Sequence, residues 1–133
     1  MTSKITYLGD LRTSSEHINS GSKIITDAPL DNHGKGEAFS PTDLVANALG
    51  CCIITVMAIK AKDMNVNLVG STAEITKTMQ AEPRRIAKIE VTINMVGSFD
   101  EKTKIILERT AMTCPVHMSL HPDLEQEVTF NWE

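Results

Sequence analysis

The stretch Ser40–Met64 reads SPTDLVANALGCCIITVMAIKAKDM, and it decides the fold. Residues 44–59 carry no charge. Ser40 is a favourable N-cap, Pro41 suits the first helical position and Asp43 completes a capping box, so the stretch predicts a helix with a well-specified start. A helix that is apolar on all sides is typically buried on all sides. We expect a soluble core helix, because the uncharged run is short and contains polar residues, whereas a membrane span needs roughly 20 apolar residues.

Length, charge and cysteine content narrow the class of protein. With 133 residues the chain is most simply one domain, residues 1–133. The net charge of -4 argues against nucleic acid and anionic membrane surfaces as partners, since both select clustered Lys and Arg. The N-terminus runs directly into a strand-like pattern without the apolar segment of a signal peptide, and three cysteines fit a reducing compartment. We expect a cytoplasmic protein with no nucleic-acid or membrane partner.

The segments on either side of the central helix predict short strands and helices. Strands are expected at Lys4–Leu11, Thr13–Asn19, Ser22–Thr26, Leu68–Met79, Ile86–Val96 and Leu124–Trp132. Helices are expected at Asp100–Met112 and from Cys114 to just before Pro122, with a loop at Asp27–Phe39. The resulting order is β-β-β-α-β-β-α-α-β, an α+β fold with antiparallel sheets around the long buried helix.

Two further expectations concern packing. The amphipathic helix at Asp100–Met112 should turn its apolar residues toward the core: Ile105, Ile106, Leu107, Ala111 and Met112. The central helix is harder to cover, because one sheet and two short helices cannot shield it on every side in a monomer. We therefore expect a homodimer that buries the central helix between subunits.

Cys52 and Cys114 are the candidate reactive residues. A reactive cysteine must be a thiolate, which requires a nearby cation or a helix N-terminus. Cys114 begins a predicted helix, whereas Cys52 lies about three turns into its helix and would need a guanidinium, for which Arg12 is the candidate. The alternative is that these thiols are small buried hydrophobic groups. Cys51, about 100° around the helix from Cys52, is expected in the core.

A competing interpretation uses the run CPVHMSLH at Cys114–His121. Cys114, His117 and His121 would share one helical face, and imidazole plus thiolate suits zinc. A closed structural zinc site needs a fourth ligand, and residues of this kind at a helix edge are more often solvated or capping. The zinc-stabilised protein stays an alternative at this point.

The pattern FSPTDLVANALGCC, followed by CPVHMSL from Cys114, resembles the OsmC/Ohr family of thiol-dependent hydroperoxide reductases. The segment SGSKIITDAP resembles the OsmC-like branch of that family. The resemblance covers essentially the whole chain. It implies an intertwined homodimer with active sites at the subunit interface, Cys52 as the peroxidatic cysteine, Cys114 as the resolving cysteine and Arg12 as the residue that stabilises the thiolate.

The resemblance also implies a reaction without a bound cofactor. The Cys52 thiolate would reduce an organic hydroperoxide to an alcohol, and the resulting sulfenic acid would form a disulfide with Cys114. A dithiol such as a protein-bound lipoyl group would then restore both thiols.

One departure from the family pattern concerns the start of the central helix. The family's peroxidases have a glutamate directly after the proline, where this chain has Thr42, and Glu16 is a candidate substitute. The loss of that carboxylate puts rapid peroxide turnover in question. The alternative function is a non-enzymatic binder of a small apolar ligand, or a redox-sensing protein, on the same fold.

Overall fold

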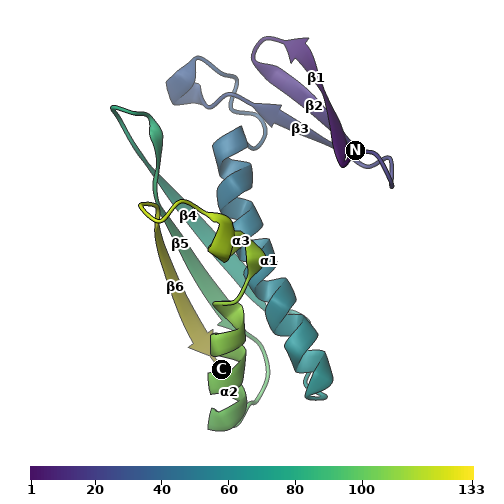
Figure 1. The fold of residues 1–133 in the computed structure, drawn as a ribbon, viewed down its shortest axis with the longest axis vertical. Helices are drawn as coiled ribbons and strands as arrows, with labels where there is room; N and C mark the ends of the chain where they lie inside the picture. Colours follow the sequence, from purple (N-terminus) through teal and green to yellow (C-terminus); the bar gives the residue numbers. More distant parts are fainter. The chain divides into compact units, whose positions relative to one another are not determined.

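The computed structural model describes residues 1–133 and confirms the predicted α+β class and element order (Figure 1). The first part of the chain forms β1 (Ser3–Gly9), β2 (Arg12–His17), β3 (Lys23–Asp27), a short 3-10 turn η1 (Leu30–Asn32) and the long helix α1 (Pro41–Asp63). The remainder forms β4 (Thr72–Gln80), β5 (Arg85–Met95), α2 (Glu101–Ala111), α3 (Pro115–Ser119) and β6 (Glu125–Trp132). The chain contains two compact units, Met1–Val45 and Ala46–Glu133. The prediction of one domain stays a prediction.

The first unit is a three-stranded antiparallel meander followed by a closed loop. Its strand order is β1-β2-β3. Residues 28–38, the 28–38 loop, turn back on themselves, since the Gly36 N–H donates to the Ala28 carbonyl at 3.2 Å. A Cβ on Gly34 would lie 1.7 Å from the same carbonyl oxygen, so only glycine fits there. The Asp27 N–H donates to the Phe39 carbonyl at 3.1 Å, which brings the two ends of the loop together.

The predicted capping box at the start of α1 is confirmed. The Asp43 N–H donates to Ser40 Oγ at 3.0 Å, and the Ser40 N–H donates to Asp43 Oδ2 at 3.0 Å. Two backbone donors that a helix start otherwise leaves unsatisfied are paired reciprocally. Asp43 is therefore occupied at the helix start.

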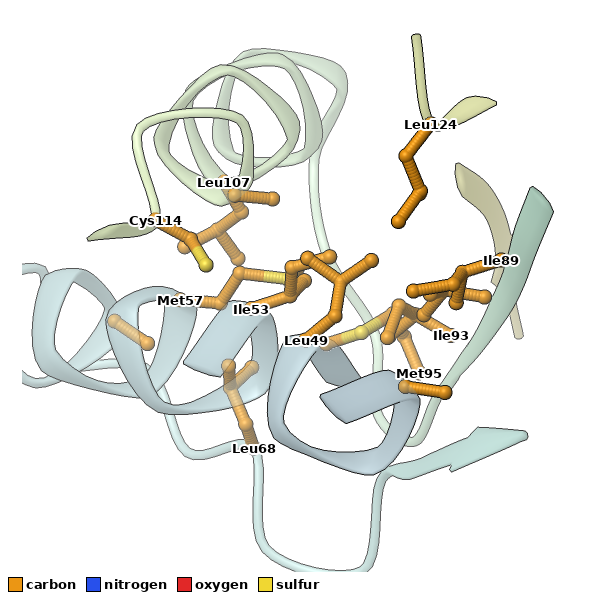
Figure 2. Close-up of a cluster of buried hydrophobic side chains, with 14 of the residues drawn as sticks. Leu49, Ile53, Met57, Leu68, Ile89, Ile93, Met95, Leu107, Cys114 and Leu124 are labelled. Atoms are coloured by element: carbon orange, nitrogen blue, oxygen red, sulfur yellow. The ribbon is translucent and has the colours of Figure 1, made fainter. Parts of the chain in front are cut away.

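The core of the second unit lies between α1, α2 and one face of the second sheet. Figure 2 shows Leu49, Ile53 and Met57 of α1 pointing into this core, with Ile89 and Ile93 of β5 on its far side. Every inward-facing residue of β5 is buried, and together they are Ile86, Ile89, Val91, Ile93 and Met95. Alternation from Ile89 to Met95 thus places one apolar face against the helices, as the sequence pattern predicted, and it is interrupted between Ile86 and Ile89, where the register with β4 shifts.

The second sheet is mixed, which corrects the expectation of antiparallel sheets only. Its strand order is β4-β5-β6, with β4 antiparallel to β5 and β6 parallel to β5. The parallel pairing follows from the connection, because α2 and α3 lie between β5 and β6 and carry the chain back to the other end of the sheet.

On α2, the expected core face is narrower than the sequence suggested. Leu107 and Ala111 are buried, but Ile105 and Met112 are exposed. Leu107 and Ala111 are one turn apart and lie on the same stripe of α2, and only this stripe is buried.

Within the single chain, α1 is buried along one stripe only. Its buried residues are Ala46, Leu49, Gly50, Ile53, Met57 and Ala61. A second apolar stripe is only partly covered, since Cys52 is half-buried, Val45 is exposed and Ile59 is 61% exposed. By length and composition α1 could also cross a membrane, a test that core helices of soluble proteins pass as well. Burial of α1 on every side would require a second subunit, and the homodimer stays a prediction.

The substitution Ile59→Lys tests this homodimer. A lysine on the partly covered stripe would put an unpaired charge into an apolar subunit interface, so we expect a weakened dimer. Light scattering after gel filtration should give the wild type about twice the 14.6 kDa chain mass, and the variant a mass closer to one chain. The control is Ile105→Lys at an exposed apolar position of α2. A wild-type mass of one chain would contradict the prediction.

Candidate active site

The structure brings the thiols of Cys52 and Cys114 together within the second unit. Cys52 lies near the middle of α1, is half-buried and packs against the core, whereas Cys114 is fully buried. Cys52 packs against the buried cluster that contains Cys114, and its thiol lies near enough to raise the pKa of the Cys114 thiol. Figure 2 shows Cys114 pointing toward α1 near Met57. The structure therefore shows that the two thiols are neighbours, which the sequence alone could not show.

Cys114 is the N-cap of α3, and this position shapes its thiol. Its Sγ accepts a hydrogen bond from the His117 N–H at 3.3 Å. Burial, followed by the neighbouring Cys52 thiol, raises the pKa of the Cys114 thiol above its ordinary range, against the smaller opposing effect of the His117 N–H. Cys114 is thus held as a thiol at neutral pH. A buried, protonated sulfur is poorly suited to be the first nucleophile in a reaction with substrate.

The short helix α3 is anchored by β6. The Nδ1 atom of His117 lies 2.5 Å from Oε1 of Gln126, and Nε2 of Gln126 donates to the His117 carbonyl at 3.2 Å. Two hydrogen bonds to one side chain fix the orientation of α3 and with it the direction of the Cys114 side chain. Sequence reasoning missed Gln126, and the only signal for it is a polar residue at an inward-facing position of β6.

The zinc alternative is not supported. His117 is engaged by Gln126, and His121 Nδ1 accepts a hydrogen bond from the Asp123 N–H at 3.0 Å. No group of three or more His, Cys, Asp or Glu side chains within residues 1–133 could hold a metal ion. The three residues at Cys114–His121 therefore act as a cap, an anchor and a turn residue.

Cys51 is exposed, which corrects its expected place in the core. It lies off the buried stripe of α1 and borders a hollow of about 220 Å³ between α1 and β4. The Asn47 side-chain amide donates to its Sγ at 3.5 Å. Because the buried stripe is set by where the helix meets β5, residue type alone misplaced Cys51.

Arg12 lies on β2 in the first unit, where it pairs with two carboxylates. Its Nε and Nη2 atoms donate to the two carboxylate oxygens of Asp27 at 2.7 and 2.8 Å, and Nη2 also donates to Glu37 Oε2 at 3.1 Å. Arg12 and Asp27 are direct partners in the β2–β3 register. The bonded carboxylates are Asp27 and Glu37 and do not include Glu16, so the suggested substitute is wrong.

The arginine keeps Asp27 ionised. The hydrogen bonds from Arg12 lower the pKa of the Asp27 carboxyl, and they outweigh the opposing effect of burial. The carboxylates in turn raise the pKa of the Arg12 guanidinium. Thr42, at the family's glutamate position, lies at the start of α1, where its Oγ1 is 3.1 Å from Ser40 Oγ.

Comparison with known proteins places this arrangement in context. Residues 34–129 match the family model described as OsmC-like protein. The crystal structure of a candidate osmotic stress induced and detoxification response protein from Psychrobacter arcticus 273-4 is 53% identical, covers 98% of this chain and 96% of its own, and has a TM-score of 0.95.

Two more distant structures share the fold. An organic hydroperoxide resistance protein from Elizabethkingia anophelis is 16% identical over 100% of this chain and 97% of its own, with a TM-score of 0.73. An organic hydroperoxide resistance protein OsmC from Legionella pneumophila is 15% identical over 98% and 97%, with a TM-score of 0.72. No curated protein matches the sequence.

The buried thiol generates a prediction about alkylation. In the folded protein at neutral pH, Cys114 should react with iodoacetamide at least ~100-fold more slowly than in the same protein unfolded in urea, because it is inaccessible and protonated. Peptide mapping by mass spectrometry at several reaction times gives the rate at each cysteine. Equal rates at Cys114 in the folded and unfolded protein would contradict the structure.

Proposed function

The chain belongs to the OsmC-like family, and on that premise we propose that it is a thiol-dependent peroxidase that reduces organic hydroperoxides. The observation that carries the proposal is the contact between the half-buried Cys52 thiol and the buried Cys114 thiol. A peroxidatic cysteine must be reachable by substrate, and its resolving partner must be near enough to form a disulfide. The two cysteines differ in accessibility in the sense that these roles require.

In the first step the Cys52 thiolate attacks the distal oxygen of a hydroperoxide ROOH. The O–O bond breaks, the departing RO⁻ takes a proton and leaves as the alcohol ROH, and Cys52 becomes a sulfenic acid. The sulfur loses two electrons and the peroxide gains them, so no metal or organic cofactor is needed. Arg12 is the proposed cation for the thiolate, on the strength of the family resemblance.

In the second step the Cys114 sulfur attacks the sulfenic sulfur of Cys52. An S–S bond forms, the S–O bond breaks, and the departing hydroxide leaves as water with the proton of the Cys114 thiol. A dithiol, for which a protein-bound lipoyl group is the proposed source, then reduces the disulfide by exchange and is itself oxidised. The cycle returns both thiols.

Apolar residues near Cys52 favour organic hydroperoxides over hydrogen peroxide. Val56, Ala48 and Ile59 lie within about two turns of Cys52 on neighbouring positions of α1. The alkyl group of an organic hydroperoxide bound there would be removed from water, which favours its binding. Hydrogen peroxide has no alkyl group and would not gain this binding free energy. The proposed substrate class is therefore a hydroperoxide with an apolar substituent.

The proposal is tested by stopped-flow reaction of the reduced protein with cumene hydroperoxide, followed by trapping of sulfenic acid with dimedone. Wild type should oxidise within seconds. Cys114→Ser should keep the first step within about threefold and accumulate trappable sulfenic acid, whereas Cys52→Ser should lose the reaction by at least ~100-fold.

The matched control is Cys51→Ser, which removes the neighbouring thiol and should stay within about twofold of wild type. Thiols that all remain free over minutes with the hydroperoxide would sink the proposal. The same result would favour the non-enzymatic alternative, in which an apolar ligand raises the melting temperature without any loss of thiols.

A further inference from the structure

Asp27 is a buried carboxylate to which the proposed peroxide chemistry gives no role. Its side chain has no exposed surface, whereas Glu37, the second carboxylate on Arg12, is 66% exposed. Burying an ionised carboxylate costs free energy unless it is paired and hydrogen-bonded. Both oxygens of Asp27 are occupied by Arg12 in a bidentate arrangement, and this is the strongest geometry such a pair can adopt.

The carboxylate is also fixed independently of Arg12. Oδ2 of Asp27 accepts a hydrogen bond from the Glu37 N–H at 3.2 Å, and the 28–38 loop closes at the Asp27 backbone through Phe39. The absence of a side chain at Gly34 allows the loop to close this tightly against the Ala28 carbonyl. Asp27 therefore acts as a rigid acceptor, and the direction of the Arg12 guanidinium follows from it.

The bonding pattern leaves one edge of the guanidinium unused by these carboxylates. Nε–H and the two hydrogens of Nη2 serve Asp27 and Glu37, and none of the three bonds involves Nη1. A guanidinium is planar and its five donors have fixed directions, so holding one edge fixes the other. The Arg12 side chain is 29% exposed, which leaves part of it open to a further partner.

We propose that Asp27 is a positioning residue for Arg12 and takes the place of the helix-start glutamate that this chain lacks at Thr42. The inference rests on the proposed function, in which Arg12 stabilises the Cys52 thiolate. A preorganised donor is worth more to a developing anion than a mobile one, because its orientation costs nothing at the moment of reaction. If only the charge of Asp27 mattered, the opposite would be expected. The carboxylate would then partly neutralise Arg12 and reduce its stabilisation of the Cys52 thiolate.

The test compares Asp27→Asn with Glu37→Gln, each in a Cys51→Ser background so that alkylation reports on Cys52. The rate of reaction with iodoacetamide is measured from pH 5 to 10, beside the rate with cumene hydroperoxide. For Asp27→Asn we expect alkylation at pH 7 to fall at least ~10-fold and its pH profile to move to higher pH. Glu37→Gln, which removes an exposed and solvent-screened charge, should stay within about twofold.

Alkylation needs no peroxide turnover, so the two proposals can fail separately. A wild type that is inert to hydroperoxide, with Asp27→Asn still slower to alkylate, would remove the proposed function and leave the positioning role standing. Alkylation of a folded Asp27→Asn that is unchanged or faster would overturn the positioning role, and a faster rate would mean that Asp27 only neutralises Arg12.

A wild-type measurement covers the case in which Asp27→Asn does not fold. The Arg12 Nε–H resonance, assigned by its loss in Arg12→Lys, should be resolved and slow to exchange at neutral pH. Because pairing lowers the pKa of Asp27, this protection should persist as the pH falls to the ordinary carboxyl value of 3.8 and disappear only below it. An Arg12 Nε–H in free exchange at neutral pH would overturn the inference.

Discussion

The contact between the Cys52 and Cys114 thiols depends on a core that fixes two separate elements. Cys52 is placed by α1, whose buried stripe through Leu49 and Ile53 packs against β5. Cys114 is placed by the start of α3, which Gln126 ties to β6 through His117. β6 and β5 are paired in the same sheet. The same sheet therefore fixes the positions of both cysteines. Without this sheet the second cysteine would be a surface turn residue with no fixed partner.

The site also separates two roles that one environment could not serve. The sulfur that attacks the peroxide needs access to substrate and a means of holding negative charge, whereas a resolving sulfur needs mainly to lie within reach of the first sulfur. Its place at the N-cap of α3, in the cluster against which Cys52 packs, gives Cys114 this position. Cys52 lies on the stripe of α1 that the single chain covers only partly, where a substrate or a second subunit can reach it. Arg12, held by Asp27, is the group that we propose for the first need.

The features of the fold that depend on neighbouring residues could be predicted from the sequence. The capping box at Ser40 and Asp43 and the alternation along β5 are written in neighbouring residues, so the elements and their order followed from the sequence. The parallel pairing of β6 and the exposure of Cys51 depend on how distant elements meet, and the predictions there were wrong. The pairing of Arg12 with Asp27 needs the strand register, which composition cannot supply. Family motifs identified both candidate cysteines, but only the fold shows that their thiols interact.

In the proposed cycle Cys52 and Cys114 together give two electrons to the hydroperoxide and end as one disulfide, and a disulfide map tests this most directly. The reduced wild-type protein is treated with one equivalent of cumene hydroperoxide, its free thiols are blocked, and proteolytic fragments are sequenced by tandem mass spectrometry without reduction. The account predicts an intramolecular bond between Cys52 and Cys114, a loss of about 2 Da per chain and a free Cys51. A bond through Cys51, a bond between chains, or a sulfenic acid that never resolves although Cys114 is free would contradict it.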